Sequence, residues 1–236
     1  MERRVSVSTF LGEPRPEVSI VVENYLQAIY KLQERGERIS PSRLAEALQV
    51  SIPTVVGTLK RLVKQGMVQI DDTRAISLTA KGTALAESVV RRHRLAECLL
   101  VDLLKIEWHR AHEEAHRMEH AISPYLEEYL AKALHYPTRC PFGHPIPGYR
   151  DREKPLPVHP LTEAREGDAV VVDRVPEEDQ RLLRFFEESG IRPGATLTVK
   201  EAASYKGTLT LQTREGEVVL GIPVATLILV RPASAS

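Results

Sequence analysis

Residues 40–78 constrain the fold more than any other part of the chain. Two helix patterns, SPSRLAEAL (40–48) and SIPTVVGTLKRLVKQG (51–66), each begin with a serine that can cap the helix and a proline in its first turn. Only the dipeptide Gln-Val separates them. Two short alternating segments follow, 68–70 and 76–78, joined by a polar turn. Paired helices followed by a hairpin, with the helical pattern VENYLQAIYKLQERG before them, predict a winged helix-turn-helix.

The second helix of this pair is locally basic, although the formal net charge of the whole chain is zero. No acidic residue occurs between positions 51 and 66, so the cationic side chains can anchor DNA phosphates while a few others read base edges. An ordinary solvated face is the alternative for these cations alone, but the helix-turn-helix and wing favour DNA. One such domain contacts few bases, so specificity calls for a dimer on a palindromic site. The predicted DNA-binding residues are Ser51, Pro53, Thr54, Lys60, Arg61, Lys64 and, on the wing, Arg74.

The rest of the chain changes character twice. Residues 79–134 read as further amphipathic helices, which suit a dimer interface, and a proline-rich run follows. Five strand-like segments rich in valine, leucine and threonine then surround one helix, EDQRLLRFFEESG, and predict a small β-barrel. The fold class is therefore α+β. We divide the chain into a flexible N-terminal extension (1–18), a winged helix-turn-helix domain (19–86), a helical metal-binding and dimerisation domain (87–150), a linker (151–160) and a C-terminal barrel domain (161–236).

The stretch HEEAHRMEH (112–120) carries the most chemistry. On a helix over residues 107–123, His112, His116, Glu119 and His120 share an arc of about a third of the circumference. Imidazoles and carboxylates are common ligands for divalent first-row metals. A solvated polar face that is rich in histidine is the alternative.

The same stretch contains H-E-x-x-H, the zinc-protease signature in which the glutamate, here Glu113, acts as the base. The extended protease pattern needs glycine at position 119 and histidine at position 122, where this chain has Glu119 and Ile122. We therefore expect no enzyme activity and keep a zinc hydrolase as a remote alternative. Upstream, His93 and Glu97 lie one helical turn apart, and an antiparallel pair of helices would bring them beside His112.

Nothing in the sequence resembles a signal peptide or a membrane span, which predicts a cytoplasmic protein. The only cysteines, Cys98 and Cys140, are too few for a disulfide framework. A winged-helix regulator that senses a small molecule or an oxidant, with Cys98 as the sensor, stays open as an alternative.

Several motifs in order resemble one family: ENYLQAIYKL, SIPTVVGTLKRLVKQGMV, LTAKG, RRHRLAECLL, HEEAHRMEH and CPFGHPIPG. The chain resembles the metal-dependent repressors of the diphtheria toxin repressor, iron-dependent repressor and manganese transport regulator family. The C-terminal segment resembles the SH3-like (FeoA-like) domain of the longer members.

The resemblance implies two metal sites per chain. The primary site would combine Asn24 with His116, Glu119 and His120. The second would combine His93, Glu97 and His112 with an acceptor from the SH3-like domain, for which Asp179 is the nearest candidate and Gln180 the next. Asn24, His116 and Gln27 depart from the family's usual residues and leave a site without thiolate, which suits Mn(II) or Fe(II) without excluding Co(II), Ni(II) or Zn(II).

The resemblance also implies a function. We expect a homodimeric transcriptional repressor of metal-uptake genes that binds palindromic operator DNA when metal is bound.

Overall fold

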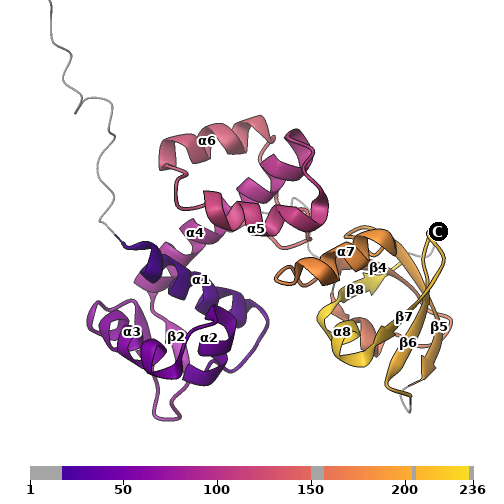
Figure 1. The fold of residues 1–236 in the computed structure, drawn as a ribbon, viewed down its shortest axis with the longest axis horizontal. Coiled ribbons are helices and arrows are strands. Elements are labelled where there is room, and N and C mark those ends of the chain that lie inside the picture. Colours follow the sequence, from indigo (N-terminus) through magenta and orange to yellow (C-terminus); the bar gives the residue numbers. More distant parts are fainter. Residues whose placement is uncertain (1–17, 150–156, 204–205, 234–236) are drawn as a thin grey trace, which may run out of the picture. The chain divides into compact units, whose positions relative to one another are not determined.

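The structure, a computed structural model, describes residues 18–149, 157–203 and 206–233, and it divides into two compact units, Met1–Val89 and Val90–Ser236 (Figure 1). The predicted N-terminal extension falls almost wholly outside the described residues, as does most of the predicted linker. Within the described part of the chain, no helix combines the length and the apolar character that crossing a membrane requires.

The first unit is the predicted winged helix-turn-helix. Its helix starts are set by serine caps: the Ser40 hydroxyl accepts from the Arg43 amide at 3.2 Å, and the Ser51 hydroxyl accepts from the Thr54 amide at 3.3 Å. The predicted hairpin is present, with Val68 opposite Leu78. The elements are α1 (Ile20–Glu34), α2 (Pro41–Leu48), α3 (Ile52–Lys64), β1 (Val68–Ile70) and β2 (Ile76–Leu78), and α4 (Ala80–Cys98) begins in this unit.

One core unites the elements of the first unit. Leu26 and Ile29 of α1, Leu44 of α2, and Val55 and Leu62 of α3 are all buried in the same cluster. Burial of this apolar face holds α3 with its opposite, basic face exposed.

The second unit begins with the C-terminal half of α4 and contains the helical and barrel segments. α4 ends in a π-helical turn, η2 (Leu99–Leu103), and the chain returns through α5 (Trp108–Met118) and α6 (Pro124–Ala133). A six-stranded antiparallel sheet follows, in the order β3-β8-β4-β5-β6-β7. Its elements are β3 (His159–Pro160), β4 (Ala169–Arg174), α7 (Gln180–Glu188), β5 (Thr196–Ala203), β6 (Thr208–Gln212), β7 (Glu217–Gly221), α8 (Ile222–Leu227) and β8 (Leu229–Pro232), with the short 3-10 turn η3 (Leu161–Glu163) after β3.

Three local predictions were wrong in detail. The segment ATLILV was predicted to be one strand, but it divides between the end of α8 and β8, because Pro223 in the first turn of α8 favours a helix start after Gly221. The two-residue strand β3 was missed. The helix expected over residues 107–123 ends at Met118, so Glu119 is its C-cap residue and His120 lies beyond it.

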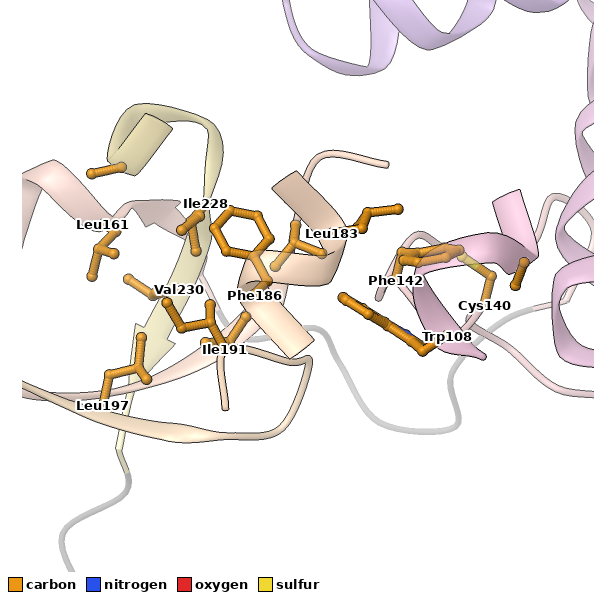
Figure 2. Close-up of a cluster of buried hydrophobic side chains, with 14 of the residues drawn as sticks. Trp108, Cys140, Phe142, Leu161, Leu183, Phe186, Ile191, Leu197, Ile228 and Val230 are labelled. Atoms are coloured by element: carbon orange, nitrogen blue, oxygen red, sulfur yellow. The ribbon is translucent and has the colours of Figure 1, made fainter. Parts of the chain in front are cut away.

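A continuous hydrophobic core runs through the second unit. Trp108 of α5 and Phe142 belong to the same buried cluster as Leu183 and Phe186 of α7 and Val230 of β8 (Figure 2). The helical segment and the barrel segment therefore bury apolar surface against each other as parts of one unit.

Candidate metal centre

The histidine-rich segment and the upstream His/Glu pair meet in the second unit. His93 and Glu97 lie one turn apart on α4, and His112 faces them from α5. His93 and Glu97 have no exposed side-chain surface, and that of His112 is 17% exposed. Helical spacing predicted that His93 and Glu97 share a face, and His112 was expected beside them if the two helices ran antiparallel.

The first cluster consists of His93, Glu97, His112 and Glu177. The His93 Nε2 atom lies 2.8 Å from Glu97 Oε1, and His112 Nδ1 lies 2.9 Å from the same oxygen. Glu177 Oε1 is 3.8 Å from His112 Nδ1. The four ligand-type atoms all lie within 4.8 Å of one another, so a single cation between them can contact every one.

Glu177 was not among the predicted ligands. Asp179, the candidate named from the sequence, caps α7 instead: its carboxylate accepts from the amides of Arg181 and Leu182 at 2.8 and 3.1 Å. It belongs to neither cluster found among the described residues, and Gln180 begins α7. The only hint in the sequence was a carboxylate directly after the apolar strand AVVVDRVP, and this hint does not distinguish Glu177 from its acidic neighbours.

The second cluster consists of His93, His116 and Glu119. His93 Nδ1 lies 2.5 Å from Glu119 Oε2, and His116 Nδ1 lies 3.1 Å from Glu119 Oε1. His120 Nε2 is 3.3 Å from the same Oε1 atom. His93 therefore faces both clusters, with one ring nitrogen toward each. Asn24, the remaining predicted ligand, lies on α1 of the first unit, and its buried Oδ1 accepts no hydrogen bond among the residues that the structure describes.

One carboxylate of each cluster, Glu97 and Glu119, has a pKa below its ordinary value. Burial and the neighbouring Glu177 raise the pKa of Glu97, but His93 and the hydrogen bond from His112 outweigh them and hold that pKa at about 2. Burial likewise raises the pKa of Glu119, but hydrogen bonds from His116 and His93 hold it well below its ordinary value. Glu97 Oε2 is buried and accepts no hydrogen bond in the described part of the chain. Buried carboxylates beside imidazoles fit a divalent cation.

Cys98 and Cys140 belong to neither cluster. Burial raises the pKa of the Cys98 thiol well above its ordinary value, and burial together with Glu97 and Glu177 does the same for Cys140. Both side chains are buried and free of disulfides. A protonated, inaccessible thiol reacts slowly with oxidants, so the geometry gives no support to Cys98 as a redox sensor.

The predicted DNA-binding residues gather on the exposed side of the first unit. All seven are exposed: Ser51, Pro53, Thr54, Lys60, Arg61 and Lys64 on or next to α3, and Arg74 on the wing. Three exposed apolar side chains on the same helix were not predicted, and two of them, Ile52 (50% exposed) and Val56 (38% exposed), lie in its N-terminal half, whereas Val63 lies near its end. Apolar groups at this position suit contact with thymine methyl groups.

Comparison with known proteins finds family matches over three consecutive segments of the chain. Residues 17–76 match the N-terminal DNA-binding domain of the iron-dependent repressors, residues 79–148 match their metal-binding and dimerisation domain, and residues 159–232 match the FeoA domain. The chain is 40% identical over 194 residues to the iron-dependent repressor IdeR of Mycobacterium leprae, covering 75% of this chain and 83% of the relative. It is 36% identical over 187 residues to the diphtheria toxin repressor of Corynebacterium efficiens, covering 75% and 81%.

Solved structures of metal-dependent repressors superpose on the chain over most of its length. A manganese-dependent transcriptional repressor in complex with manganese superposes with a TM-score of 0.81 at 34% identity, covering 90% of this chain and all of that one. The manganese regulator SloR superposes with a TM-score of 0.75 at 32% identity, covering 90% and 98%.

These matches confirm the predicted α+β architecture, with its winged helix-turn-helix, helical dimerisation segment and SH3-like barrel. They also confirm that the chain is a regulator and not a hydrolase, so H-E-x-x-H is here a coincidence of spacing. The chain belongs to the iron-dependent repressor family of metal-dependent, DNA-binding transcriptional regulators.

Proposed function

We propose that this protein is a cytoplasmic, homodimeric repressor of metal-uptake genes that binds a palindromic operator when Mn(II) or Fe(II) is bound. The observation that carries the proposal is the burial of three carboxylates, Glu97, Glu119 and Glu177, around a shared His93. Buried carboxylates are costly without counter-charge, and a divalent cation supplies it.

Two ions per chain would be held by two ligand sets. His93, Glu97, His112 and Glu177 form the first cluster, with three of its four side chains fully or almost fully buried. His116, Glu119 and His120 of the second cluster would form the predicted primary site together with Asn24, whose buried acceptor oxygen favours this role. Both sets offer nitrogen and oxygen donors without thiolate, which suits Mn(II) or Fe(II).

The regulatory logic follows from which unit supplies each ligand. When bound, the cation supplies positive charge that donors of the second unit share with Asn24 of α1. Asn24 belongs to the same packed unit as α3, so restricting α1 restricts the recognition helix as well. A two-fold operator requires a fixed spacing between two recognition helices, and molecules outside that pose do not contribute to binding.

On DNA, the two ends of α3 have different tasks. Ser51, Pro53 and Thr54 stand at its N-terminal turn, where side chains can reach base edges in the major groove. Lys60, Arg61 and Lys64 lie further along the helix, where they would neutralise phosphates, with Arg74 of the wing beside the backbone or minor groove. These cations would give the affinity its salt dependence.

Operator binding titrated under anaerobic conditions with Mn(II), Fe(II) and Zn(II) in turn tests the proposal. Glu119→Gln removes a buried carboxylate from the second cluster and should abolish the metal stimulation while the protein stays dimeric. Glu114→Gln is the matched control, because Glu114 lies on α5 with its side chain 43% exposed and paired with Arg117. Tight operator binding by chelator-treated wild-type protein would refute metal activation.

A further inference from the structure

The segment Arg139–Gly148, which we call the docking turn, is tightly fixed to the helices of the second unit. Its own backbone closes through the Cys140 amide, which donates to the His144 carbonyl at 2.9 Å. Arg94 of α4, which is fully buried, donates to the Pro145 carbonyl, and Arg91 donates to the Pro147 carbonyl at 3.0 Å. The docking turn is therefore a rigid extension of the helical segment.

The end of β4 and the residue after it, Val175, lie along the docking turn. Both the amide and the carbonyl of Val175 bond to it. The Val175 amide donates to the Phe142 carbonyl at 3.1 Å, and His144 Nε2 lies 3.0 Å from the Val175 carbonyl. Arg139 Nη1 lies 3.2 Å from each carboxylate oxygen of Asp173. The β4 register shifts between Val172 and Arg174, and such a bulge re-aims the residue within it, here Asp173.

Gly143 makes this close approach possible. Its φ of +89° suits glycine, and a Cβ atom at this position would lie 2.0 Å from the Asp173 carbonyl oxygen and 2.8 Å from the Arg174 Cα atom. Both obstacles are backbone atoms that cannot swing aside. Any side chain at position 143 would therefore push the end of β4 away from the docking turn.

A second set of contacts joins α5 to α7 and the residues after it. The Arg192 guanidinium lies over the Trp108 ring at 5.0 Å from its centroid, and His109 Nδ1 lies 2.7 Å from Glu187 Oε2. Trp108 also donates from Nε1 to the Pro141 carbonyl at 3.1 Å, so the same ring contacts both the docking turn and the barrel segment. Apolar burial around Trp108 and Phe142 adds to these bonds (Figure 2).

We propose that the docking turn is a metal-independent seat for the SH3-like domain, and that Arg139 and Gly143 are positioning residues for Glu177. The bonds of Val175, Asp173, Trp108 and Gly143 involve no metal-ligand atom of either cluster. Glu177 follows Val175 by two residues, so fixing the Val175 backbone brings the Glu177 carboxylate to the first cluster. Its Oε2 also lies 3.4 Å from His144 Nε2 of the docking turn. The consequence for metal rests on the proposed function, but the docking itself does not.

The docking is tested first in chelator-treated protein, by amide hydrogen exchange after selective valine labelling. The Val175 amide reports the seat, and the Val172 amide, which donates to the Ala195 carbonyl at 2.9 Å, reports the barrel alone. Gly143→Ala should accelerate exchange at Val175 at least about tenfold while Val172 stays protected. Gly167→Ala is the matched control, because Gly167 has the same φ of +89° but open space around an added Cβ atom.

Trp108 provides a second readout, because it is the only tryptophan of the chain and is 4% exposed. In metal-free protein, Gly143→Ala should increase acrylamide quenching of its fluorescence about two- to threefold, and Gly167→Ala should not. If Gly143→Ala also deprotects Val172, the variant has lost the barrel. Arg139→Gln, which removes the ion pair with Asp173 and the bond to the Gly143 carbonyl, then takes its place. The proposed seat would be refuted if the Val175 amide stayed as protected as in the wild type in both Gly143→Ala and Arg139→Gln. It would also be refuted if that amide exchanged rapidly in the metal-free wild-type protein.

Titration with Mn(II) separates this inference from the proposed function. Gly143→Ala should weaken binding at the cluster containing Glu177 at least about tenfold, because fewer molecules present that carboxylate. Glu177→Gln should weaken binding similarly while Val175 stays protected. If Glu177→Gln binds Mn(II) normally but Val175 is protected, the ligand assignment fails and the seat stands.

Discussion

The assignment of Glu177 can be tested against its neighbour Asp179, because the two residues make opposite predictions. Glu177→Gln keeps the size of the side chain and removes one charge from the first cluster. At pH 8, above the ordinary imidazole pKa of about 6.5, the change should leave the metal-free midpoint of unfolding little altered. The reason is that Glu177 repels the ionised Glu97, as its effect on the pKa of Glu97 shows.

With metal present the same change should be costly. Loss of a group that merely orients a metal ligand weakens a site about ten- to a hundredfold, or about 1.4–2.7 kcal/mol, and loss of the Glu177 carboxylate should cost at least as much. At a fixed metal concentration well above the dissociation constant, that amount disappears from the metal-linked stabilisation. For a unit of this size, about 2–4 °C of midpoint corresponds to each kcal/mol, so the Mn(II)-induced shift should shrink by about 3–11 °C.

Differential scanning calorimetry with and without Mn(II) measures both quantities. Asp179→Asn is the control, because asparagine caps a helix as well as aspartate does and α7 should keep its start. The reasoning fails if Glu177→Gln retains the full metal-induced shift, or if Asp179→Asn loses it.

Three further predictions concern other parts of the molecule. His93→Gln should weaken Mn(II) binding at both clusters, because His93 belongs to the first and contacts Glu119 of the second, whereas His112→Gln should weaken only the first. Equilibrium dialysis counts the ions, and equal losses would contradict the shared role of His93. Metal affinity should fall from pH 7 to pH 5 as imidazoles gain protons, because Glu97, with a pKa of about 2, stays ionised throughout; a flat calorimetric profile would oppose this. Gly57→Ala should stabilise the protein against urea by about 0.5–1 kcal/mol, since an added Cβ meets open space on an exposed helix. The same methyl group should weaken operator binding, because it would keep α3 from lying close to the DNA. Unchanged operator affinity would show that α3 needs no close approach at Gly57.

The sequence was most informative where local chemistry decides the structure. Ser40 and Ser51 cap their helices through the predicted hydroxyl groups, and the hairpin register follows from alternation over a short turn. These features depend on residues within a few positions of one another, so they can be predicted without the rest of the fold. The division of ATLILV into helix and strand depends on Pro223 and on the β8 partners β3 and β4, which lie far away in sequence.

The site shows the same limit. Helical spacing placed His93 and Glu97 on one face, because i and i+4 residues share a helix face. The approach of His112 was expected only from an antiparallel pair of helices. No periodicity could find Glu177, since it reaches the cluster from an irregular segment between β4 and α7, 65 residues after His112 in sequence. Its place depends on long-range contacts between the docking turn and the end of β4, above all on the room left by Gly143.

The charge of the first cluster explains why the SH3-like domain matters to the metal. His93 and His112 are neutral when they act as ligands, so Glu97 alone would give the cluster one negative charge. Glu177 brings a second carboxylate, itself 1% exposed, and the cluster then matches the two positive charges of a divalent cation. In a buried site the uncompensated charge dominates the energy, because the surroundings screen it poorly. We therefore expect a barrel segment held in place by the docking turn to complete the three helical ligands, giving a site whose charge favours divalent over monovalent ions.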